Sequence, residues 1–163
     1  MSIQIKHCKS EDLKDCSKLM AEVYGAPPYC EKWDINDAYS YLNKFLKIDS
    51  KGCLLAHDRS TLIGALFCYS YPWHKEKLTY IQELFVSLEY RRKGVASMLL
   101  DYLNDKDTCK VWLIANEKSE AFQFYKAKGL AEVGDYKLIS GKINNSGLLA
   151  NADNQGSVPQ AHK

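Results

Sequence analysis

The sequence has no apolar run close to the ~20 residues that a helix needs to span a bilayer. It does not begin like a secretory signal either, because Lys6, Lys9 and Glu11 interrupt any apolar start. We therefore expect a cytoplasmic protein that makes no use of a membrane. Its 163 residues fit one domain, and 46% are hydrophobic against 26% charged, which is typical of a soluble globular chain.

An excess of charge of one sign is also missing. Lys and Arg total 22 and Asp and Glu total 20, for a net charge of +2. This balance argues against nucleic-acid binding by bulk charge. The basic run at Arg91, Arg92 and Lys93 is therefore a local feature that needs its own explanation.

Closely spaced metal ligands are absent from the sequence. No two of the six cysteines stand within four residues of each other and the four histidines are scattered, so we expect no metal site. An even number of cysteines could also indicate disulfides. Because several lie inside apolar runs such as KGCLLA and GALFCYSY, and no secretory signal is seen, we expect buried free thiols.

Hydrophobic periodicity divides the chain into strands and helices. Strand patterns cover residues 3–8, 52–58, 61–71, 78–87, 109–115, 130–134 and 136–143. Helical patterns cover residues 10–24, 34–48, 95–103 and 119–128, with Ser10 and Asp34 as expected N-caps and Gly129 as the last C-cap. Residues 72–77 are expected to form a loop, and the nearly all-apolar segment 109–115 is expected in the middle of the sheet.

The predicted order is therefore βααβββαβαββ. One strand–helix–strand crossover implies a parallel pair, and the hairpins imply antiparallel pairs elsewhere. We predict a mixed α/β fold with a mostly antiparallel sheet of about seven strands flanked by helices. After Ile143 the sequence becomes polar and rich in Asn and Gly, so we expect a domain over residues 1–143 and a disordered tail over 144–163.

The segment VSLEYRRKGVASMLLDYL joins the end of a strand to a basic glycine loop and the start of an amphipathic helix. The first N–H groups of a helix are unsatisfied and attract anions, and a glycine lets a phosphate approach the backbone. One glycine does not make a Walker loop or a dinucleotide-binding fingerprint. The alternative is a solvated basic loop followed by an ordinary core helix.

Two segments together resemble the GNAT superfamily of N-acetyltransferases. The family's acetyl-CoA signature, [Q/R]-x-x-G-x-[G/A], is filled here by Arg91, Arg92, Lys93, Gly94, Val95 and Ala96. Many members have Gly where this chain has Arg92. The later segment VWLIANEKSEAFQFYKAKGLAEVG resembles the family's second landmark through Asn116, Tyr125, Gly129 and Leu130. The resemblance covers residues 3–143 and includes the order of the elements.

The resemblance implies acetyl-CoA as cosubstrate and no metal. The backbone N–H groups of residues 92–96 would then hold the pyrophosphate. The backbone of Leu84, Phe85 and Val86 would pair with the pantetheine arm, although their side chains are expected to be sheet core. Asn116 would hydrogen-bond the same arm, with capping of the next helix as its alternative role.

Acetyl transfer to an amine requires removal of the ammonium proton, stabilisation of an oxyanion and departure of a thiolate. By resemblance, Tyr125 protonates the departing thiolate. Without the resemblance, the aromatic residues of this helix, Phe122, Phe124 and Tyr125, would indicate only packing. Glu83 is our candidate base, with a charged residue at the open end of the sheet as the alternative. Gln82 is expected on the opposite face of the strand. A backbone N–H near Val86 would meet the oxyanion.

The acceptor is expected to be an amine, such as a polyamine, an aminoglycoside or a peptide amine. In this fold it would lie between the first two helices and the loop after the third strand. Those segments supply aromatic side chains and acids, which attract cations. The candidates for binding are Tyr29, Trp33, Tyr71 and Trp73, with Tyr24, Tyr39, Glu31, Asp34 and Glu76 nearby in the sequence.

The predicted function is direct acetyl transfer from acetyl-CoA to a primary amine of a small cationic molecule, by a monomer or homodimer. One alternative acceptor is a protein lysine or N-terminal amine. Another possibility is a non-catalytic CoA-binding regulatory module on the same fold. No cysteine stands at the end of the strand 78–87, so an acyl-cysteine route is not expected.

Overall fold

The computed structural model describes residues 2–104, 110–135 and 137–139. The chain divides into two compact units, Met1–Leu113 and Ile114–Lys163. The predicted tail 144–163 lies outside the described residues. Across the described residues, no helix is both long and apolar enough to span a membrane.

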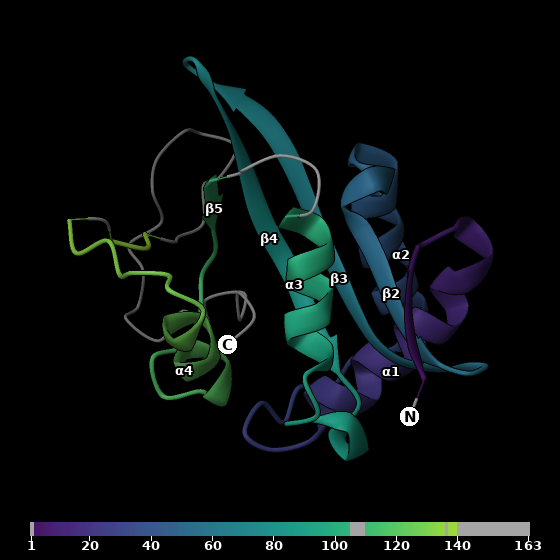
Figure 1. Cartoon of the computed structure of the whole chain (residues 1–163). Coiled ribbons are helices and arrows are strands. Elements are labelled where there is room, and N and C mark those ends of the chain that lie inside the picture. Colours follow the sequence, from purple (N-terminus) through teal and green to yellow (C-terminus); the bar gives the residue numbers. More distant parts are fainter. Residues whose placement is uncertain (1, 105–109, 136, 140–163) are drawn as a thin grey trace, which may run out of the picture. The chain divides into compact units, whose positions relative to one another are not determined.

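A five-stranded sheet forms the centre of the first unit (Figure 1). Its strands, in spatial as well as chain order, are β1 (Ile3–His7), β2 (Cys53–Asp58), β3 (Thr61–Trp73), β4 (Glu76–Val86) and β5 (Lys110–Trp112). The first four are antiparallel neighbours, and β5 pairs in parallel with β4. The mixed, mostly antiparallel fold is therefore confirmed.

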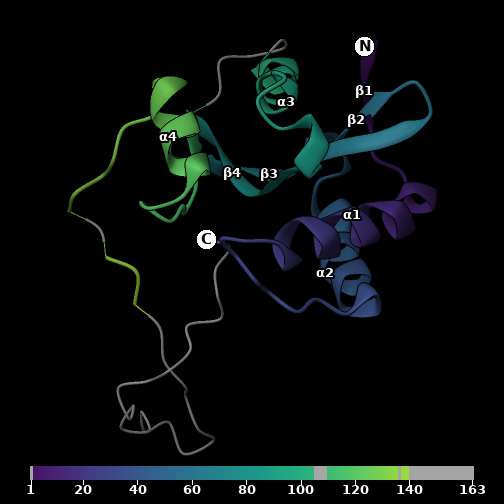
Figure 2. The same cartoon turned by 90° about the horizontal axis from the view of Figure 1, so that it is seen from below.

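Helices cover both faces of this sheet. Helices α1 (Leu13–Gly25) and α2 (Ile35–Ile48) lie on one face, and α3 (Val95–Asn104) lies on the other (Figure 2). The main hydrophobic cluster lies between α1, α2 and the sheet, and includes Leu13, Met20, Leu42, Phe67 and Phe85. Burial of these apolar side chains is the main stabilising contribution of this layer.

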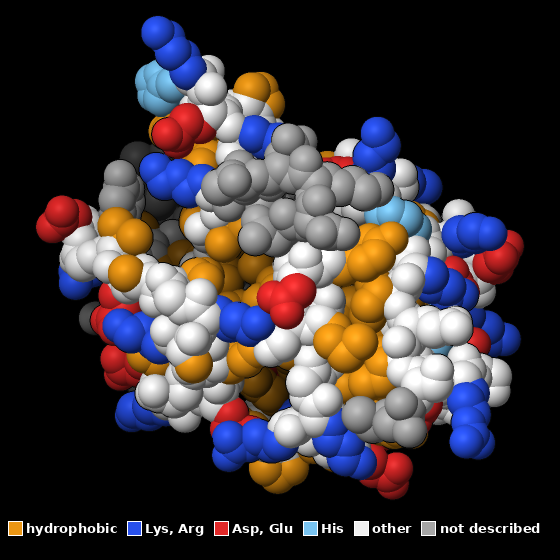
Figure 3. All heavy atoms as spheres, in the orientation of Figure 1, with side chains coloured by type: hydrophobic (Ala, Val, Ile, Leu, Met, Phe, Trp, Pro, Cys, Tyr) orange, Lys and Arg blue, Asp and Glu red, His pale blue; other side chains and the backbone are white. Residues whose placement is uncertain are grey.

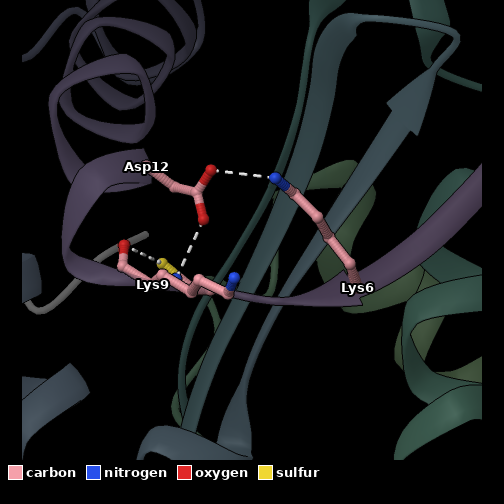
Figure 4. Close-up of polar contacts among 4 residues, drawn as sticks. Lys6, Lys9 and Asp12 are labelled. Carbon is pink, nitrogen blue, oxygen red and sulfur yellow. Dashed lines mark hydrogen bonds and ion pairs between the residues drawn. The ribbon is translucent and has the colours of Figure 1, made fainter.

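Local signals in the sequence account for the start of each helix on this face. The Asp34 carboxylate accepts the N–H groups of Asn36 and Asp37, as predicted for an N-cap. The expected Ser10 cap is wrong, because a short helix η1 (Ser10–Asp12) precedes α1. The Asp12 carboxylate accepts the Lys9 N–H and the Lys6 ammonium, both at 2.9 Å (Figure 4).

The expected loop over residues 72–77 is instead the end of a long hairpin. Strand β3 continues to Trp73 and β4 begins at Glu76, with only His74 and Lys75 between them. Pro72 has no N–H for a sheet ladder, but β2 ends its pairing with β3 at Phe67. Beyond that point β3 has only β4 as a neighbour, so a proline is tolerated.

The expected central position of the segment 109–115 is wrong. Strand β5 has three residues and lies at the edge of the described sheet. Trp112 is 46% exposed and Ile114 is 40% exposed. An all-apolar run shows that a segment is hydrophobic but not where it lies in a sheet. In this structure part of its apolar surface remains exposed.

The cysteines are free wherever the structure describes them. Cys8, Cys16, Cys53 and Cys68 are buried, as expected, whereas Cys30 is exposed. Burial raises the pKa of the Cys53 thiol, and a hydrogen bond with Cys8, followed by burial, raises the pKa of the Cys16 thiol. The four buried cysteines therefore serve as packing residues.

The second unit contains helix α4 (Glu120–Ala127). Ser119 caps it through the Phe122 N–H, a cap that was not predicted, and Gly129 follows with a φ of +87°, as predicted for the C-cap. The two expected strands at 130–134 and 136–143 are not observed in residues 130–135 and 137–139. The sheet of the described residues therefore has five strands rather than the seven that alternation predicted.

Candidate functional site

The basic loop between β4 and α3 has an unusual backbone. A short helix η3 (Leu88–Tyr90) leads into a turn in which Arg92 has a φ of +62° and Gly94 a φ of +82°. The Met98 N–H donates to the Gly94 carbonyl at 3.0 Å. The N–H groups that precede it, on Val95 to Ser97, therefore have no acceptor within the helix.

Positive side chains surround this helix start. Arg92 and Lys93 are exposed, and the Lys93 ammonium lies 5.0 Å from the centre of the Tyr90 ring. Lys and Arg side chains gather at this end of α3 (Figure 3). A Cβ placed on Gly94 would meet no atom within 4 Å, so space is open above the backbone. The loop therefore fits an anionic group.

Strand β4 provides a backbone edge close to the same loop. Its pairing with β5 covers only Leu78 to Tyr80, whereas its pairing with β3 continues to Val86. In the described pairing, Leu84, Phe85 and Val86 therefore have a strand on one side only. Phe85 is buried against Phe67 and Tyr24, so its side chain is core, as expected. The backbone edge fits an extended amide-bearing chain.

Gly64 brings this edge and α3 together. It lies on β3 opposite Val86. A Cβ there would lie 3.1 Å from both the Phe85 carbonyl oxygen and Val95 Cγ1. The absent side chain thus allows the first residue of α3 to pack closely on the sheet beside the end of β4.

Glu83 is a buried carboxylate, with only 1% of its surface exposed. Its Oε2 accepts the Tyr24 hydroxyl and its Oε1 accepts the Tyr41 hydroxyl, both at 2.6 Å. The carboxylate therefore has hydrogen-bond donors within the first unit and is not exposed to solvent. Glu83 is held between α1 and α2, and Tyr41 is the more exposed of its two donors.

Gln82 joins the same group of side chains, contrary to expectation. Its Nε2 donates to the Tyr41 oxygen at 2.6 Å. The register shift explains this: Glu83 pairs with Phe67 and Ile81 with Cys68, which leaves Gln82 as an extra residue in β4. Such a bulge breaks the strict alternation of side chains between faces.

The Tyr41 hydroxyl is strongly perturbed by its surroundings. Burial, followed by the negative charge of Glu83 and its hydrogen bond, raises the Tyr41 pKa well above its ordinary value. The hydroxyl therefore remains a hydrogen-bond donor to the carboxylate at neutral pH. Sequence analysis did not select Tyr41, although a tyrosine among the apolar residues of a helix is a signal that a buried hydroxyl needs a hydrogen-bond partner.

Two of the predicted acceptor residues lie beside this network. The Trp33 ring lies 5.3 Å from that of Tyr41, and the Tyr29 ring packs edge-on against Tyr24 at 5.2 Å. The Trp33 Nε1 donates to Glu31 Oε2 at 2.7 Å. Aromatic rings and two carboxylates thus come together in the α1–α2 region.

The other acceptor candidates lie elsewhere or have structural roles. Trp73 is 55% exposed at the tip of the β3–β4 hairpin. The Tyr71 hydroxyl accepts the Trp112 Nε1 at 2.7 Å. Asp34 caps α2, and Glu76 lies 3.5 Å from the Lys110 ammonium. The expected acceptor surface is therefore reduced to its α1–α2 part.

Asn116 and Tyr125 belong to the second unit. Asn116 Oδ1 accepts the Lys118 N–H at 2.9 Å, so its side chain forms a turn, while capping of α4 falls to Ser119. Tyr125 is 9% exposed on α4, with its ring 5.3 Å from that of Phe124. Each keeps the local position that the sequence predicted.

The first unit therefore combines a basic loop at the start of a helix, a strand edge and a buried carboxylate on that strand. Among the described residues, no group of three His, Cys, Asp or Glu side chains could hold a metal ion. The three features suit a phosphate-bearing thioester and an amine.

Comparison with known proteins identifies the family of the chain. The family model described as Acetyltransferase (GNAT) family matches residues 14–129. A curated relative, the L-2,4-diaminobutyric acid acetyltransferase of Marinococcus halophilus, is 27% identical over 77 residues. That match spans 47% of this chain and 44% of the relative, so less than half of either is compared.

Solved structures share the fold at low identity. A possible acetyltransferase from Clostridium difficile 630 has a TM-score of 0.71 at 19% identity, covering 88% of this chain and 99% of that one. A ribosomal-protein-alanine N-acetyltransferase from Brucella melitensis biovar Abortus 2308 has a TM-score of 0.67 at 20% identity, covering 88% and 100%.

Proposed function

The chain belongs to the GNAT acetyltransferase family, and we propose that it transfers the acetyl group of acetyl-CoA directly to a primary amine of a small cationic molecule. The observation that carries the proposal is the buried Glu83 carboxylate on β4. The part of β4 beyond Tyr80 has no β5 partner, and the basic loop follows β4 in the chain. The diaminobutyrate acetyltransferase among the relatives supports a small amine as acceptor.

In this proposal, acetyl-CoA lies along β4 and the start of α3. The N–H groups of residues 92–96 and the charges of Arg91, Arg92 and Lys93 hold its pyrophosphate. The backbone of Leu84, Phe85 and Val86 pairs with its pantetheine arm, as does Asn116. A backbone N–H near Val86 stabilises the oxyanion that develops during transfer.

Glu83 serves as the base. The reacting ammonium must lose a proton before nitrogen can attack, because free alkylamines have a pKa of roughly 10.4. Tyr41 is more exposed than Glu83 and donates to it. The Tyr41 oxygen takes the ammonium proton as the hydroxyl passes its own proton to Glu83 Oε1. The departing CoA thiolate takes a proton from the Tyr125 hydroxyl.

An acetyl-CoA consumption assay over a panel of amines tests this function. The panel includes alkylamines, polyamines, aminoglycosides and peptides with free N-termini or lysines, and CoA binding is measured on the same preparation. We expect turnover with small cationic amines. Turnover with peptides alone would identify a protein acceptor, and CoA binding without any turnover would identify a regulatory module.

A further inference from the structure

Glu31 has a carboxylate oxygen to which no described residue donates a hydrogen bond. It lies between α1 and α2, where its N–H donates to the Tyr24 carbonyl at 2.8 Å. Oε2 accepts the Trp33 indole N–H at 2.7 Å. Oε1 is shielded from solvent and has no hydrogen-bond partner within the part of the chain that the structure describes.

A buried carboxylate oxygen without a donor is destabilising, because it has lost its hydration without replacement. Over the described residues, no Lys, Arg or His nitrogen lies within 4.0 Å of Glu31. The oxygen is therefore suited to a donor that arrives with a ligand. A cation is the most favourable donor, since charge-assisted hydrogen bonds are the strongest.

Glu31 is joined to the proposed catalytic carboxylate by two routes. Tyr24 accepts the Glu31 N–H through its carbonyl and donates its hydroxyl to Glu83. On the other route, the Trp33 ring that Glu31 orients lies 5.3 Å from the ring of Tyr41, which also donates to Glu83. Each carboxylate thus accepts a hydrogen bond from one member of the Trp33–Tyr41 pair of rings.

We infer that Glu31 selects acceptors with a second cationic nitrogen, so that the substrate class is the diamines and polyamines. This inference rests on the proposed function. One ammonium loses its proton at the Tyr41–Glu83 end and receives the acetyl group. The other keeps its charge and donates to Glu31 Oε1 beside the Trp33 ring, whose face attracts cations.

A kinetic comparison tests the inference. Wild-type enzyme is assayed with α,ω-alkyldiamines from propane to hexane and with the n-alkylamine of equal length in each case. Since one partly buried charge-assisted hydrogen bond is at stake, the best diamine should exceed its matched monoamine in kcat/KM by about 10- to 100-fold. The difference should lie in KM, because Glu31 binds the ammonium that does not react.

The variant Glu31→Gln removes the charge but keeps an oxygen that can accept the Trp33 N–H. It should lose the preference for the diamine and leave kcat/KM for the monoamine nearly unchanged. Glu22→Gln is the matched control, because it removes the same charge from an exposed position on neighbouring α1. The melting temperatures of both variants verify that they are folded.

Calorimetric binding of the best diamine to the protein–CoA complex separates this inference from the proposed function. If wild-type enzyme uses monoamines and diamines equally, or if Glu31→Gln keeps the preference, the inference is overturned and the proposed function stands. If no amine is acetylated, the proposed function fails. In that case, diamine binding to wild type that is lost in Glu31→Gln would still support the cation site. Diamine binding that is absent in wild type, or unchanged in Glu31→Gln, would overturn the inference.

Discussion

Replacing Tyr41 by phenylalanine removes one oxygen from the centre of the Glu83 network. The ring and its packing against Trp33 and Phe45 remain. The buried carboxylate loses the donor at 2.6 Å on Oε1. Hydrogen bonds to charged groups contribute about 1.5–3 kcal/mol, so the free energy of unfolding at neutral pH should fall by about that amount.

The same substitution should alter stability at alkaline pH. Burial and the charge of Glu83 raise the Tyr41 pKa in the folded protein. The unfolded chain loses this proton near pH ~10 while the folded protein keeps it, so the stabilising contribution is complete below pH 10 and declines above it. The stability difference between wild type and Tyr41→Phe should therefore shrink by about 1.4 kcal/mol between pH 9 and pH 11.

Urea denaturation followed by tryptophan fluorescence at several pH values measures both effects. Tyr39→Phe is the matched control, since Tyr39 is an exposed tyrosine on the same helix. It should change the free energy of unfolding by less than about 0.5 kcal/mol. If Tyr41→Phe matches wild type at neutral pH and declines in parallel with it above pH 10, the Tyr41–Glu83 hydrogen bond does not exist as described.

Three further predictions concern the loop, the thiolate and the start of α1. Gly94→Val should weaken CoA binding at least 10-fold by calorimetry, because a side chain would obstruct the anion. Since Gly94 has a φ of +82°, the valine should also lower the free energy of unfolding by about 1–2 kcal/mol. Unchanged CoA affinity in a folded variant would contradict the assignment of this loop. Tyr125→Phe should lower kcat about 10-fold or more with CoA affinity and melting temperature retained, and full turnover would make Tyr125 a packing residue. Although burial alone would raise the Asp12 pKa, Lys6 and the Lys9 N–H outweigh it and hold that pKa below its ordinary value. Asp12→Asn should therefore cost about 0.5–1 kcal/mol above pH ~4, and the difference from wild type should vanish as the pH falls below 3, whereas a constant difference would contradict the pairing.

Local signals in the sequence were sufficient for most of the fold. Caps at Asp34 and Ser119 and the glycine at Gly129 mark helix ends, because each satisfies backbone groups of its own helix. The parallel crossover from β4 through α3 to β5 follows from the order of elements and the handedness of such units. The basic glycine loop was visible for the same reason, since every residue in it is adjacent along the chain.

The tertiary structure alone decided how the carboxylates are used. An alternating strand separates Gln82 from Glu83, but the shifted register with β3 brings both to Tyr41. No local pattern reports this, because the bulge depends on pairing with residues that are distant in the chain. Glu31 likewise looked like one of several acids near the aromatic residues. In the folded protein one of its carboxylate oxygens is shielded from solvent and the other accepts the Trp33 N–H, and burial of that kind arises only when separate segments pack.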